Sequence, residues 1–496
     1  MALILGDILS CAAGAAPGRT AATLDDDRIT FGQLQDRASR LANALLGLGL
    51  RRGDRVAYWA DISLDAPALK FALGRIAVTF APLNPAYSPA EARALLEYLS
   101  PRLLITDPAR SEMGEALATE LDLPLAILGG PQAGPGTSLD ELSAAASAAE
   151  PTAPLPAEDD VATIFATSGS TGQPKGVMVS HRATWLRTHA GSGAEVTTHG
   201  KGQVVMFPLF HMAGWIFALN AWSAHQPAHF VRRADSGALL SAVDRHGAGS
   251  LYCIPAVWQR ILADPSPHRA DSLDWALIGT SRVEPDLLER IRGRFPRAKM
   301  TVSYGSTETG GAIRLRDEDL FTKPGSIGLP VPGLQARLAP DGELLIRSGT
   351  LMSGYFGLPE ETSQALAGGW YHTGDLATQD GDGYFTIAGR TQDMIRSGGE
   401  WVAPAEVEAA LAGYPGLADL AVLGLPDADW GEVVCAAIVV ADGASAPSVA
   451  DLRGHVGTRL AAYKHPRRVL VVGQIPRTAA TGQVRRSALL RQEVLR

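Results

Sequence analysis

A short polar loop that follows an apolar run most limits what this chain can fold into. The apolar run covers residues 161–166, and the loop at residues 167–176 carries four hydroxyls, three glycines and one lysine. Glycine lets backbone N–H groups turn toward an anion, while hydroxyls and an ammonium add donors and positive charge. The loop therefore predicts a phosphate site after a buried strand, although it lacks the Gly-Lys-Ser/Thr of a Walker loop. A plain polar turn between two strands is the alternative.

Length and composition limit the class of protein. A chain of 496 residues exceeds what one hydrophobic core supports, so we expect at least two domains. Its net charge of −8 argues against a nucleic-acid partner, and 46% hydrophobic residues are typical of a globular protein. Cys11, Cys253 and Cys435 match no metal-ligand spacing, and the first residues lack a basic signal-peptide segment. No apolar run is long enough to span a bilayer, so a cytoplasmic protein with reduced thiols is expected.

Helical and extended patterns alternate in the first part of the chain. Residues 30–33 have the form of a capping box, and apolar residues then recur at helical spacing up to Leu48. Further predicted strands and helices follow in turn at residues 56–59, 66–73, 77–81, 90–99 and 103–106. This alternation predicts an α/β protein with parallel or mixed sheets covered by helices. Residues 131–156, rich in Ala, Ser, Pro and Gly, are expected to form an excursion on the surface.

Two later segments combine polar side chains with glycine. Residues 302–310 read Val-Ser-Tyr-Gly-Ser-Thr-Glu-Thr-Gly, and residues 370–376 read Trp-Tyr-His-Thr-Gly-Asp-Leu. A carboxylate such as Glu308 suits Mg²⁺, and one such as Asp375 can accept bonds from both hydroxyls of a ribose. A helix N-cap with an acidic first turn and a tight turn at Gly374-Asp375 are the alternatives.

Together with these segments, the loop at residues 167–176 resembles the phosphate loop of adenylate-forming enzymes. This superfamily contains acyl-CoA synthetases, stand-alone adenylation domains and firefly luciferase, and its motifs occur in the expected order over nearly the whole chain. The resemblance implies a large N-terminal domain (1–390) of mixed sheets covered by helices. A small mobile α+β domain (391–496) follows, joined by a hinge at Asp393. The nucleotide-binding residues it implies are Thr167, Ser168, Gly169, Ser170, Thr171, Gly172, Lys175, Gly279, Thr280, Ser281, Tyr304, Gly305, Asp375 and Arg390.

The resemblance also assigns roles around the reacting carboxyl group. Thr307 would bond the α-phosphate and Glu308 would hold Mg²⁺, and both are candidate catalytic residues. The implied acyl pocket is lined by Phe207, His211, Met212, Gly310 and Gly311. His211 would lie beside the thiol tunnel, with a buried core histidine as the alternative. Residues 206–215 contain no aspartate to pair a substrate ammonium, so a plain carboxylic acid is expected. The small side chains at 310–312 predict a bulky acyl group.

Past the predicted hinge, residues 396–408 resemble the loop that swings over the active site for thiol transfer. Gly398 and Gly399 would leave room for a pantetheine arm, with Gly399 acting in catalysis, and Trp401 would border the tunnel or pack a domain interface. Lys464 and Arg467 would meet the phosphates of CoA or form a solvated basic edge. The small domain is expected to contain helices at 406–411 and 449–460 and strands at 420–423, 433–440 and 468–472.

One position departs from the family. Residues 475–486 resemble its last motif, but Gln483 stands where the characteristic lysine is expected. In the family that lysine offsets the repulsion between the substrate carboxylate and the α-phosphate during adenylation. An amide keeps a hydrogen bond without the charge, and losing one such contact commonly costs on the order of 10²–10³ in rate. Arg477, Arg485 or Arg486 could compensate, but a planar guanidinium does not simply replace an ammonium.

The sequence therefore predicts an enzyme that joins CoA to a preformed acyl-adenylate and releases AMP, with adenylation weak or lost. In this it resembles the non-adenylating acyl-CoA ligases of natural-product pathways, such as platensimycin-type antibiotic biosynthesis. The implied partners are an acyl-adenylate or carboxylic acid, CoA and a separate adenylating enzyme. ATP and Mg²⁺ are needed only if adenylation occurs. The alternatives are a full ATP-dependent acid–CoA ligase, a nucleotide-binding pseudoenzyme, and a carrier protein in place of CoA as the acceptor.

Overall fold

The computed structural model describes residues 2–130, 136–168, 174–190, 200–390, 393–397, 400–427, 429–478 and 482–494. The chain divides into two compact units. The first contains Met1–Pro324, Pro330–Gln335 and Arg347–Tyr371, and the second contains Gly325–Leu329, Ala336–Ile346 and His372–Arg496. A larger N-terminal α/β part and a smaller C-terminal part confirm the predicted fold class. The division between residues 390 and 391 stays a prediction.

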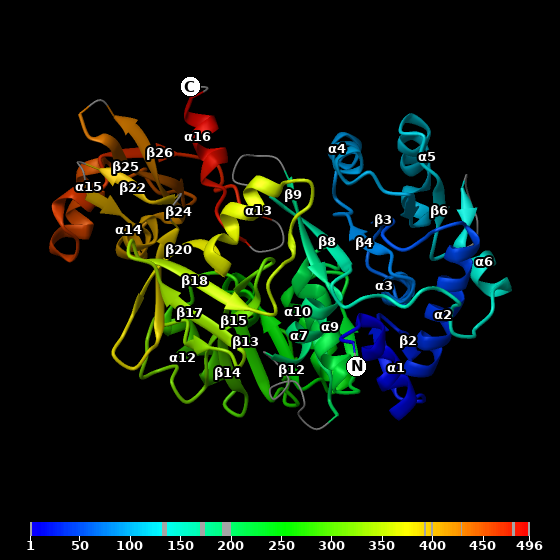
Figure 1. The fold of residues 1–496 in the computed structure, drawn as a ribbon. Coiled ribbons are helices and arrows are strands. Elements are labelled where there is room, and N and C mark those ends of the chain that lie inside the picture. The colour runs from blue at the N-terminus through cyan, green and yellow to red at the C-terminus, as the bar shows by residue number, and fades with distance from the viewer. Residues whose placement is uncertain are drawn as a thin grey trace. The chain divides into compact units, whose positions relative to one another are not determined.

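The first unit contains the sheet that carries the predicted phosphate loop. Its strands run in the order β19-β9-β8-β4-β3-β5-β6-β7 (Figure 1). The strands are β3 (Arg55–Trp59), β4 (Thr79–Pro82), β5 (Leu103–Thr106), β6 (Leu125–Ile127), β7 (Thr137–Ser138), β8 (Val161–Ser168), β9 (Pro174–Ser180) and β19 (Gly354–Tyr355). Pairing is parallel from β8 to β7, whereas β9 pairs antiparallel with both β8 and β19. The predicted loop thus joins two paired strands, and residues 169–173 at its centre lie outside the described residues.

Side-chain caps begin several of the helices that accompany this sheet. These helices are α1 (Leu5–Ala15), α2 (Phe31–Gly47), α3 (Asp65–Arg75), α4 (Pro89–Leu99), α5 (Ser111–Glu120), α6 (Leu139–Ala145), α7 (His181–Ala190) and α9 (Met212–Ser223), with the 3₁₀ turn η1 (Pro108–Arg110). Those with a side-chain cap are α2, α4, α6 and α9. Thr30 and Gln33 form the predicted capping box of α2. Residues 137–145 form β7 and α6 where the sequence predicted only a surface excursion. Ser138 explains the difference, because its side chain accepts the N–H of Glu141 and starts a helix.

A second mixed sheet carries the polar segment at residues 302–310. Its order is β16-β15-β14-β13-β12-β10-β11-β1-β2. The strands are β1 (Thr20–Leu24), β2 (Asp27–Thr30), β10 (Gln203–Val205), β11 (Ala228–Phe230), β12 (Ser250–Cys253), β13 (Trp275–Gly279), β14 (Lys299–Ser306), β15 (Gly310–Leu315) and β16 (Leu329–Pro330). The accompanying helices are α10 (Ser236–His246), α11 (Pro255–Ala263) and α12 (Pro285–Arg294). The run from β1 through β14 is parallel, and β14 and β15 form an antiparallel hairpin whose turn contains Thr307 and Glu308.

A smaller sheet has the order β17-β18-β20-β21. Its strands are β17 (Leu334–Leu338), β18 (Glu343–Ser348), β20 (Tyr371–Gln379) and β21 (Phe385–Arg390), and α13 (Pro359–Ala365) and η2 (Ala367–Gly369) precede β20. In the antiparallel pair β20–β21, Asp375 stands opposite Arg390. The register therefore brings two predicted ribose-binding residues together.

The rest of the second unit is built on a sheet with the order β23-β22-β25-β24, with β26 beside β25. Its elements are β22 (Ile395–Ser397), β23 (Glu400–Val402), α14 (Pro404–Leu411), β24 (Leu417–Asp427), β25 (Gly431–Val440), α15 (Val449–Val456), η4 (Gly457–Arg459), η5 (Ala462–Lys464), β26 (Arg468–Val471) and α16 (Arg486–Val494). Alternate residues of β24 and β25 face opposite sides, where α14 and α15 cover one core and Leu489 of α16 joins the other. The predicted helix 449–460 is shorter, because Gly457 has φ 43° and ψ −125° and ends it.

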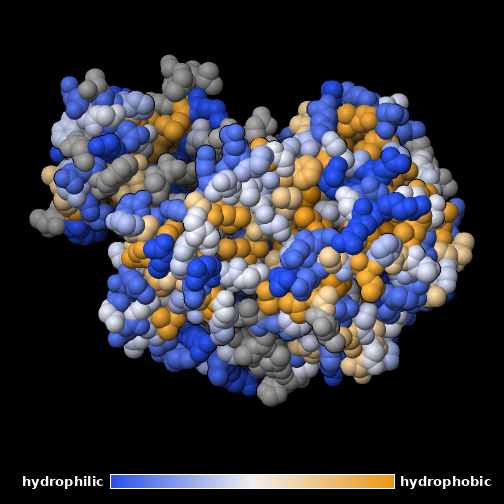
Figure 2. All heavy atoms as spheres, in the orientation of Figure 1, coloured by the Kyte–Doolittle hydropathy of each residue, from blue (hydrophilic) through white to orange (hydrophobic). Residues whose placement is uncertain are grey.

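No helix within the described ranges is long and apolar enough to cross a membrane. Figure 2 shows hydrophilic and hydrophobic residues intermixed over the visible face of the first unit.

Candidate functional site

The turn between β14 and β15 holds the predicted phosphate and metal ligands. The Ser306 hydroxyl oxygen accepts the N–H groups of Glu308 (3.2 Å) and Thr309 (3.3 Å), which fixes the turn. Thr309 is buried, and its hydroxyl donates to the carbonyl of Gly310 at 2.8 Å. The Thr307 hydroxyl has no hydrogen bond within the described ranges, so it is available to a ligand oxygen.

Arg187 of α7 fastens this turn from behind. Its guanidinium donates to the carbonyl oxygens of Thr350 (2.7 Å), Thr307 (3.0 Å) and Glu308 (2.9 Å). The side chain is buried, which lowers its pKa to about 10, so it stays charged at neutral pH. Sequence reasoning missed Arg187. Its spacing from the buried His181 and Thr184, on one face of the helix, was the available signal.

Arg187 also explains the glycine at position 310. Gly310 has φ 70°, and a Cβ atom there would lie 2.8 Å from Cγ of Arg187. The absence of a side chain at Gly310 thus has a local cause, independent of the size of the acyl group. At Gly311, by contrast, the nearest atom to an added Cβ is Nη2 of Arg314, at 3.8 Å. The bulky acyl group stays a prediction.

Glu308 is connected to the phosphate loop through a tyrosine. The hydroxyl of Tyr355 donates to Oε1 of Glu308 at 3.1 Å, and the ammonium of Lys175 lies 4.9 Å from the centre of the Tyr355 ring. Tyr371 bonds to Tyr355 in turn. Burial raises the pKa of both phenols, so both remain protonated donors. The structure thus brings Lys175 and Glu308 to one place, and the two tyrosines are residues that sequence reasoning missed.

The residues at this turn fit Mg²⁺. Magnesium is commonly held by one or two protein carboxylates, waters and the phosphates of a nucleotide. Glu308 is a half-buried carboxylate, and its Oε1 accepts a hydrogen bond from the neutral hydroxyl of Tyr355. The described residues contain no cluster of three or more His, Cys, Asp or Glu side chains that could hold a metal alone. Glu308 would therefore share such an ion with a polyphosphate.

His211 has a local structural role. It is the N-cap of α9, and its Nδ1 accepts the N–H of Ala213 at 3.2 Å. Burial lowers its pKa to about 4, so at neutral pH the ring is uncharged and carries its proton on Nε2. The ring stacks on Phe207, with centroids 5.9 Å apart, and Met212 follows at the start of α9. Three predicted acyl-pocket residues therefore adjoin, and the tunnel role of His211 stays a prediction.

The predicted nucleotide segments of β13 and β14 lie side by side, with Gly279 opposite Ser303. A Cβ at Gly279 would lie 2.0 Å from the Tyr252 hydroxyl, so only glycine fits there. The next residue, Thr280, has φ 72°, which is costly for a β-branched side chain. Tyr304 and Gly305 lie near the carboxyl end of β14, and Ser281 lies two residues beyond β13. The carboxyl edge of parallel strands is where α/β sheets usually bind nucleotides.

In the second unit, Nε of Arg390 donates to Oδ1 of Asp375 at 3.1 Å, and Asp375 is 7% exposed. The predicted hinge residue Asp393 accepts from Arg486 at 3.2 Å. Arg486 also bonds Glu408 (2.6 Å) and the carbonyl of Val422 (2.7 Å), so its guanidinium is fully engaged. The ribose and hinge roles stay predictions.

Gln483 lies exposed in a loop that the backbone closes on itself. Thr478 N–H donates to the carbonyl of Gln483 at 2.8 Å, and Gln483 N–H donates to the Thr478 hydroxyl at 3.1 Å. Of the arginines considered as replacements for a lysine, Arg477 pairs with Asp419 at 2.7 Å and Arg486 is held as described above. Arg485 is exposed, and its guanidinium makes no ion pair within the described ranges.

Lys464 and Arg467, the predicted CoA contacts, interact with neighbouring side chains. Lys464 Nζ bonds both oxygens of Glu406, at 2.6 and 2.7 Å, and the guanidinium of Arg467 lies 3.6 Å from the centre of the Trp430 ring. In the phosphate loop, the Thr167 hydroxyl donates to the carbonyl of Lys175 at 3.3 Å. The remaining predictions fall outside the described residues: Gly169, Ser170, Thr171, Gly172, Gly398, Gly399 and the side chains of Ser168 and Trp401.

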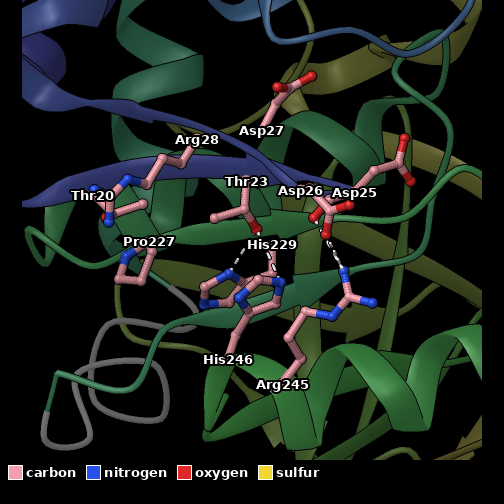
Figure 3. A pocket seen from close by; sticks show the side chains of 10 residues that line it. All are labelled: Thr20, Thr23, Asp25, Asp26, Asp27, Arg28, Pro227, His229, Arg245 and His246. Carbon is pink, nitrogen blue, oxygen red and sulfur yellow. Dashed lines mark hydrogen bonds and ion pairs between the residues drawn. The ribbon is translucent and has the colours of Figure 1, made fainter.

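A surface hollow of about 420 Å³ lies elsewhere, beside β1 and α10 (Figure 3). Arg245 pairs with Asp26 in it, and the Thr23 hydroxyl bonds Nδ1 of His229 at 2.9 Å. It contains none of the residues that the sequence predicted for the site.

The comparisons with known proteins define the class to which this α/β protein belongs. Residues 10–356 match the AMP-binding enzyme family and residues 406–481 match the AMP-binding enzyme C-terminal domain. The chain belongs to the AMP-binding enzyme family.

Relatives match over the whole length of the chain. The chain is 35% identical over 490 residues to a feruloyl-CoA synthase of Amycolatopsis sp, covering 95% of this chain and 96% of that protein. It is 33% identical over 500 residues to a methyl-dioxo-octahydroindenyl-propanoyl:CoA ligase of Rhodococcus jostii (strain RHA1), covering 95% of each. ATP-bound MatB from Rhodopseudomonas palustris is 28% identical, with a TM-score of 0.88 over 99% of each chain.

Proposed function

We propose that this protein is an acyl-CoA ligase that forms the thioester from a preformed acyl-adenylate, with adenylation weak or lost. Two relatives named for making CoA thioesters, each matching 95% of the chain, support the ligase assignment. The restriction to the second half-reaction rests on one observation: Gln483 offers an uncharged amide at the position where the family has its lysine.

Adenylation brings two anions together. The carboxylate oxygen attacks the α-phosphorus of ATP, a new P–O bond forms and pyrophosphate leaves, so a nearby cation lowers the barrier. Arg477 and Arg486 are engaged by Asp419, Asp393 and Glu408, so their charges are already balanced. Mg²⁺, when bound with ATP, neutralises phosphate charge, and Glu308 would hold it. The family's lysine would act on the carboxylate itself, and this is the cation that Gln483 does not provide.

Thioester formation makes a smaller electrostatic demand. The CoA sulfur attacks the acyl carbon, the bond to the phosphate oxygen breaks, AMP leaves and the thiol proton passes to water. The Thr307 hydroxyl would hold the α-phosphate and Asp375 the ribose. Arg187 would keep the Thr307–Glu308 turn in place through its three carbonyl contacts. Because none of these groups depends on position 483, we expect this step to be retained, with the adenylate supplied by a separate enzyme.

The test compares two reactions of the purified protein. One contains ferulic, 4-hydroxycinnamic or cinnamic acid with ATP, Mg²⁺ and CoA, and the other contains the corresponding synthetic acyl-adenylate with CoA. Acyl-CoA from the adenylate alone is expected. Equal rates in both reactions would overturn the restriction, and no product in either would favour a pseudoenzyme. Replacing CoA by a phosphopantetheinylated carrier protein tests the other acceptor.

A full ATP-dependent ligase is the second candidate. The exposed Arg485, two residues from Gln483, favours it, because a guanidinium with no ion pair within the described ranges is available to move to the carboxylate. The retained Lys175–Tyr355–Glu308 arrangement also suits a nucleotide triphosphate.

A further inference from the structure

Lys70 of α3 is a buried cation. Residues 66–75 of this helix are all buried, and Lys70 is 1% exposed. Its ammonium donates to the Thr163 hydroxyl at 2.6 Å. Aromatic rings surround it, with Nζ 4.8 Å from the centre of Trp215, 5.2 Å from Phe80 and 5.8 Å from Phe165. No carboxylate within the described ranges forms an ion pair with it.

Such a group is costly to maintain. An ammonium has three hydrogens to donate, and Thr163 is the hydrogen-bond acceptor that the described residues provide. The aromatic faces attract the cation but satisfy no N–H group. Burial accordingly lowers the pKa of Lys70 to about 7. A methionine of similar length would fill the space without this cost, so the lysine is unexplained by packing.

Lys70 lines a small cavity beside the predicted acyl segment. The cavity, of about 20 Å³, has Lys70, Thr163 and Phe165 on its wall together with Arg187, Met212 and Trp215. This volume holds about one water molecule or one polar atom of a ligand. Met212 and Trp215 belong to α9, which starts at the predicted acyl segment, and Arg187 holds the Thr307–Glu308 turn. The wall of the cavity therefore includes residues of the elements that would hold the acyl-adenylate.

We propose that Lys70 determines substrate specificity by donating a hydrogen bond to an oxygen at the far end of the acyl group. The substrate class is a ring-bearing carboxylic acid with a phenolic or keto oxygen distant from the carboxyl group. The aromatic residues Phe165 and Trp215 would contact the ring, and the flexible side chain of Met212 would move to admit it. This inference rests on the proposed function as an acyl-CoA ligase.

Binding of stable adenylate analogues tests the proposal without requiring either half-reaction. Isothermal titration calorimetry would compare 4-hydroxycinnamoyl with cinnamoyl sulfamoyladenosine, and 4-hydroxybenzoyl with benzoyl sulfamoyladenosine, because the two lengths probe depth. The wild type is expected to bind the hydroxylated member of one pair about ten-fold more tightly or better, as a charge-assisted hydrogen bond allows. Lys70→Met should lose this preference while binding the unhydroxylated member as the wild type does.

Arg75→Met is the matched control. Arg75 is a second buried cation of α3, but it bonds Ser39, Ser10 and Gln35 and does not line the cavity. Its loss should lower stability and leave the preference unchanged. In thioester formation, Lys70→Met should raise KM for the 4-hydroxycinnamoyl adenylate with little change in kcat.

Three results would overturn the inference: no preference in the wild type for either pair, an unchanged preference in Lys70→Met, or an equal loss of affinity for both members. The last would mark a packing role. Absence of binding by all four analogues, together with absence of thioester formation, would instead refute the proposed function.

Discussion

Lys70 and Gln483 differ in burial and in charge, and each has the opposite charge state from the one that its exposure to solvent would favour. Position 70 is buried among aromatic rings, where a charge is costly, and it has a lysine. Position 483 is exposed, where a charge costs little, and it has a neutral glutamine although the resemblance of residues 475–486 implies a lysine there. Folding stability explains neither choice. Under the two proposals, function explains both choices, because position 70 would contact a distal acyl oxygen and position 483 would lie at the reacting carboxylate.

The largest effect is expected from Gln483→Lys. Restoring the cation should raise acid-dependent release of pyrophosphate from ATP by on the order of 10²–10³, while thioester formation from the adenylate changes little. Gln483→Met, which adds no charge, is the control. If the rates of both half-reactions rise, or neither rises, position 483 does not act selectively on adenylation.

Arg187→Met should have the next largest effect. It removes a donor from three carbonyl oxygens, of which that of Glu308 keeps the N–H of Met352 at 2.7 Å. We expect a loss of about 3 kcal/mol in the free energy of unfolding. Thioester formation should fall as well, because the Thr307–Glu308 turn loses its support. Denaturant unfolding measures the first effect.

The control is Arg182→Met on the same helix, where loss of the partly exposed pairs with Glu158 and Asp159 should cost about 1 kcal/mol. Equal losses of unfolding free energy in the two variants would show that Arg187 does not specifically support the Thr307–Glu308 turn.

The pH dependence of the free energy of unfolding tests whether burial lowers the pKa of Lys70. Its pKa is lowered from 10.5 to about 7 on folding. Between these values the unfolded chain binds more protons than the folded chain, so this group makes the wild type more stable as the pH rises. Lys70→Met should therefore stabilise the protein most below pH 7. The difference in stability between the variant and the wild type should shrink as the pH approaches 10. Thermal unfolding of both proteins over this range checks the sign. A constant difference would show that Lys70 keeps its ordinary pKa.

The smallest effect is expected from Arg485→Gln. If Gln483 has no substitute, residual pyrophosphate release by this variant should equal that of the unaltered protein. A marked fall would identify Arg485 as the compensating cation and favour the full ATP-dependent ligase.

Local patterns predicted much of the fold. The capping box at Thr30 and the alternating strands and helices of the first unit could be read directly, because caps and periodicity are properties of neighbouring residues. The helix at residues 449–460 was predicted too long because Gly457 takes a backbone conformation that no local pattern reveals. In the excursion before the phosphate loop, composition concealed a helix that the Ser138 cap could have indicated.

The site was predictable where a motif is contiguous and not where it is assembled from distant segments. Thr307 and Glu308 stand in one motif, whereas their support comes from Arg187, 120 or more positions away along the chain. Tyr355 joins Lys175 to Glu308 across three separate elements. Lys70 looked like one more residue of a helix, because burial beside a cavity depends on the packing of α3 against the sheet and α9.

Exchange of labelled pyrophosphate into ATP by the unaltered protein tests the central claim most directly. We expect no acid-dependent exchange. The same preparation should convert the matching acyl-adenylate and CoA into acyl-CoA. Strong acid-dependent exchange in that same preparation would contradict the claim.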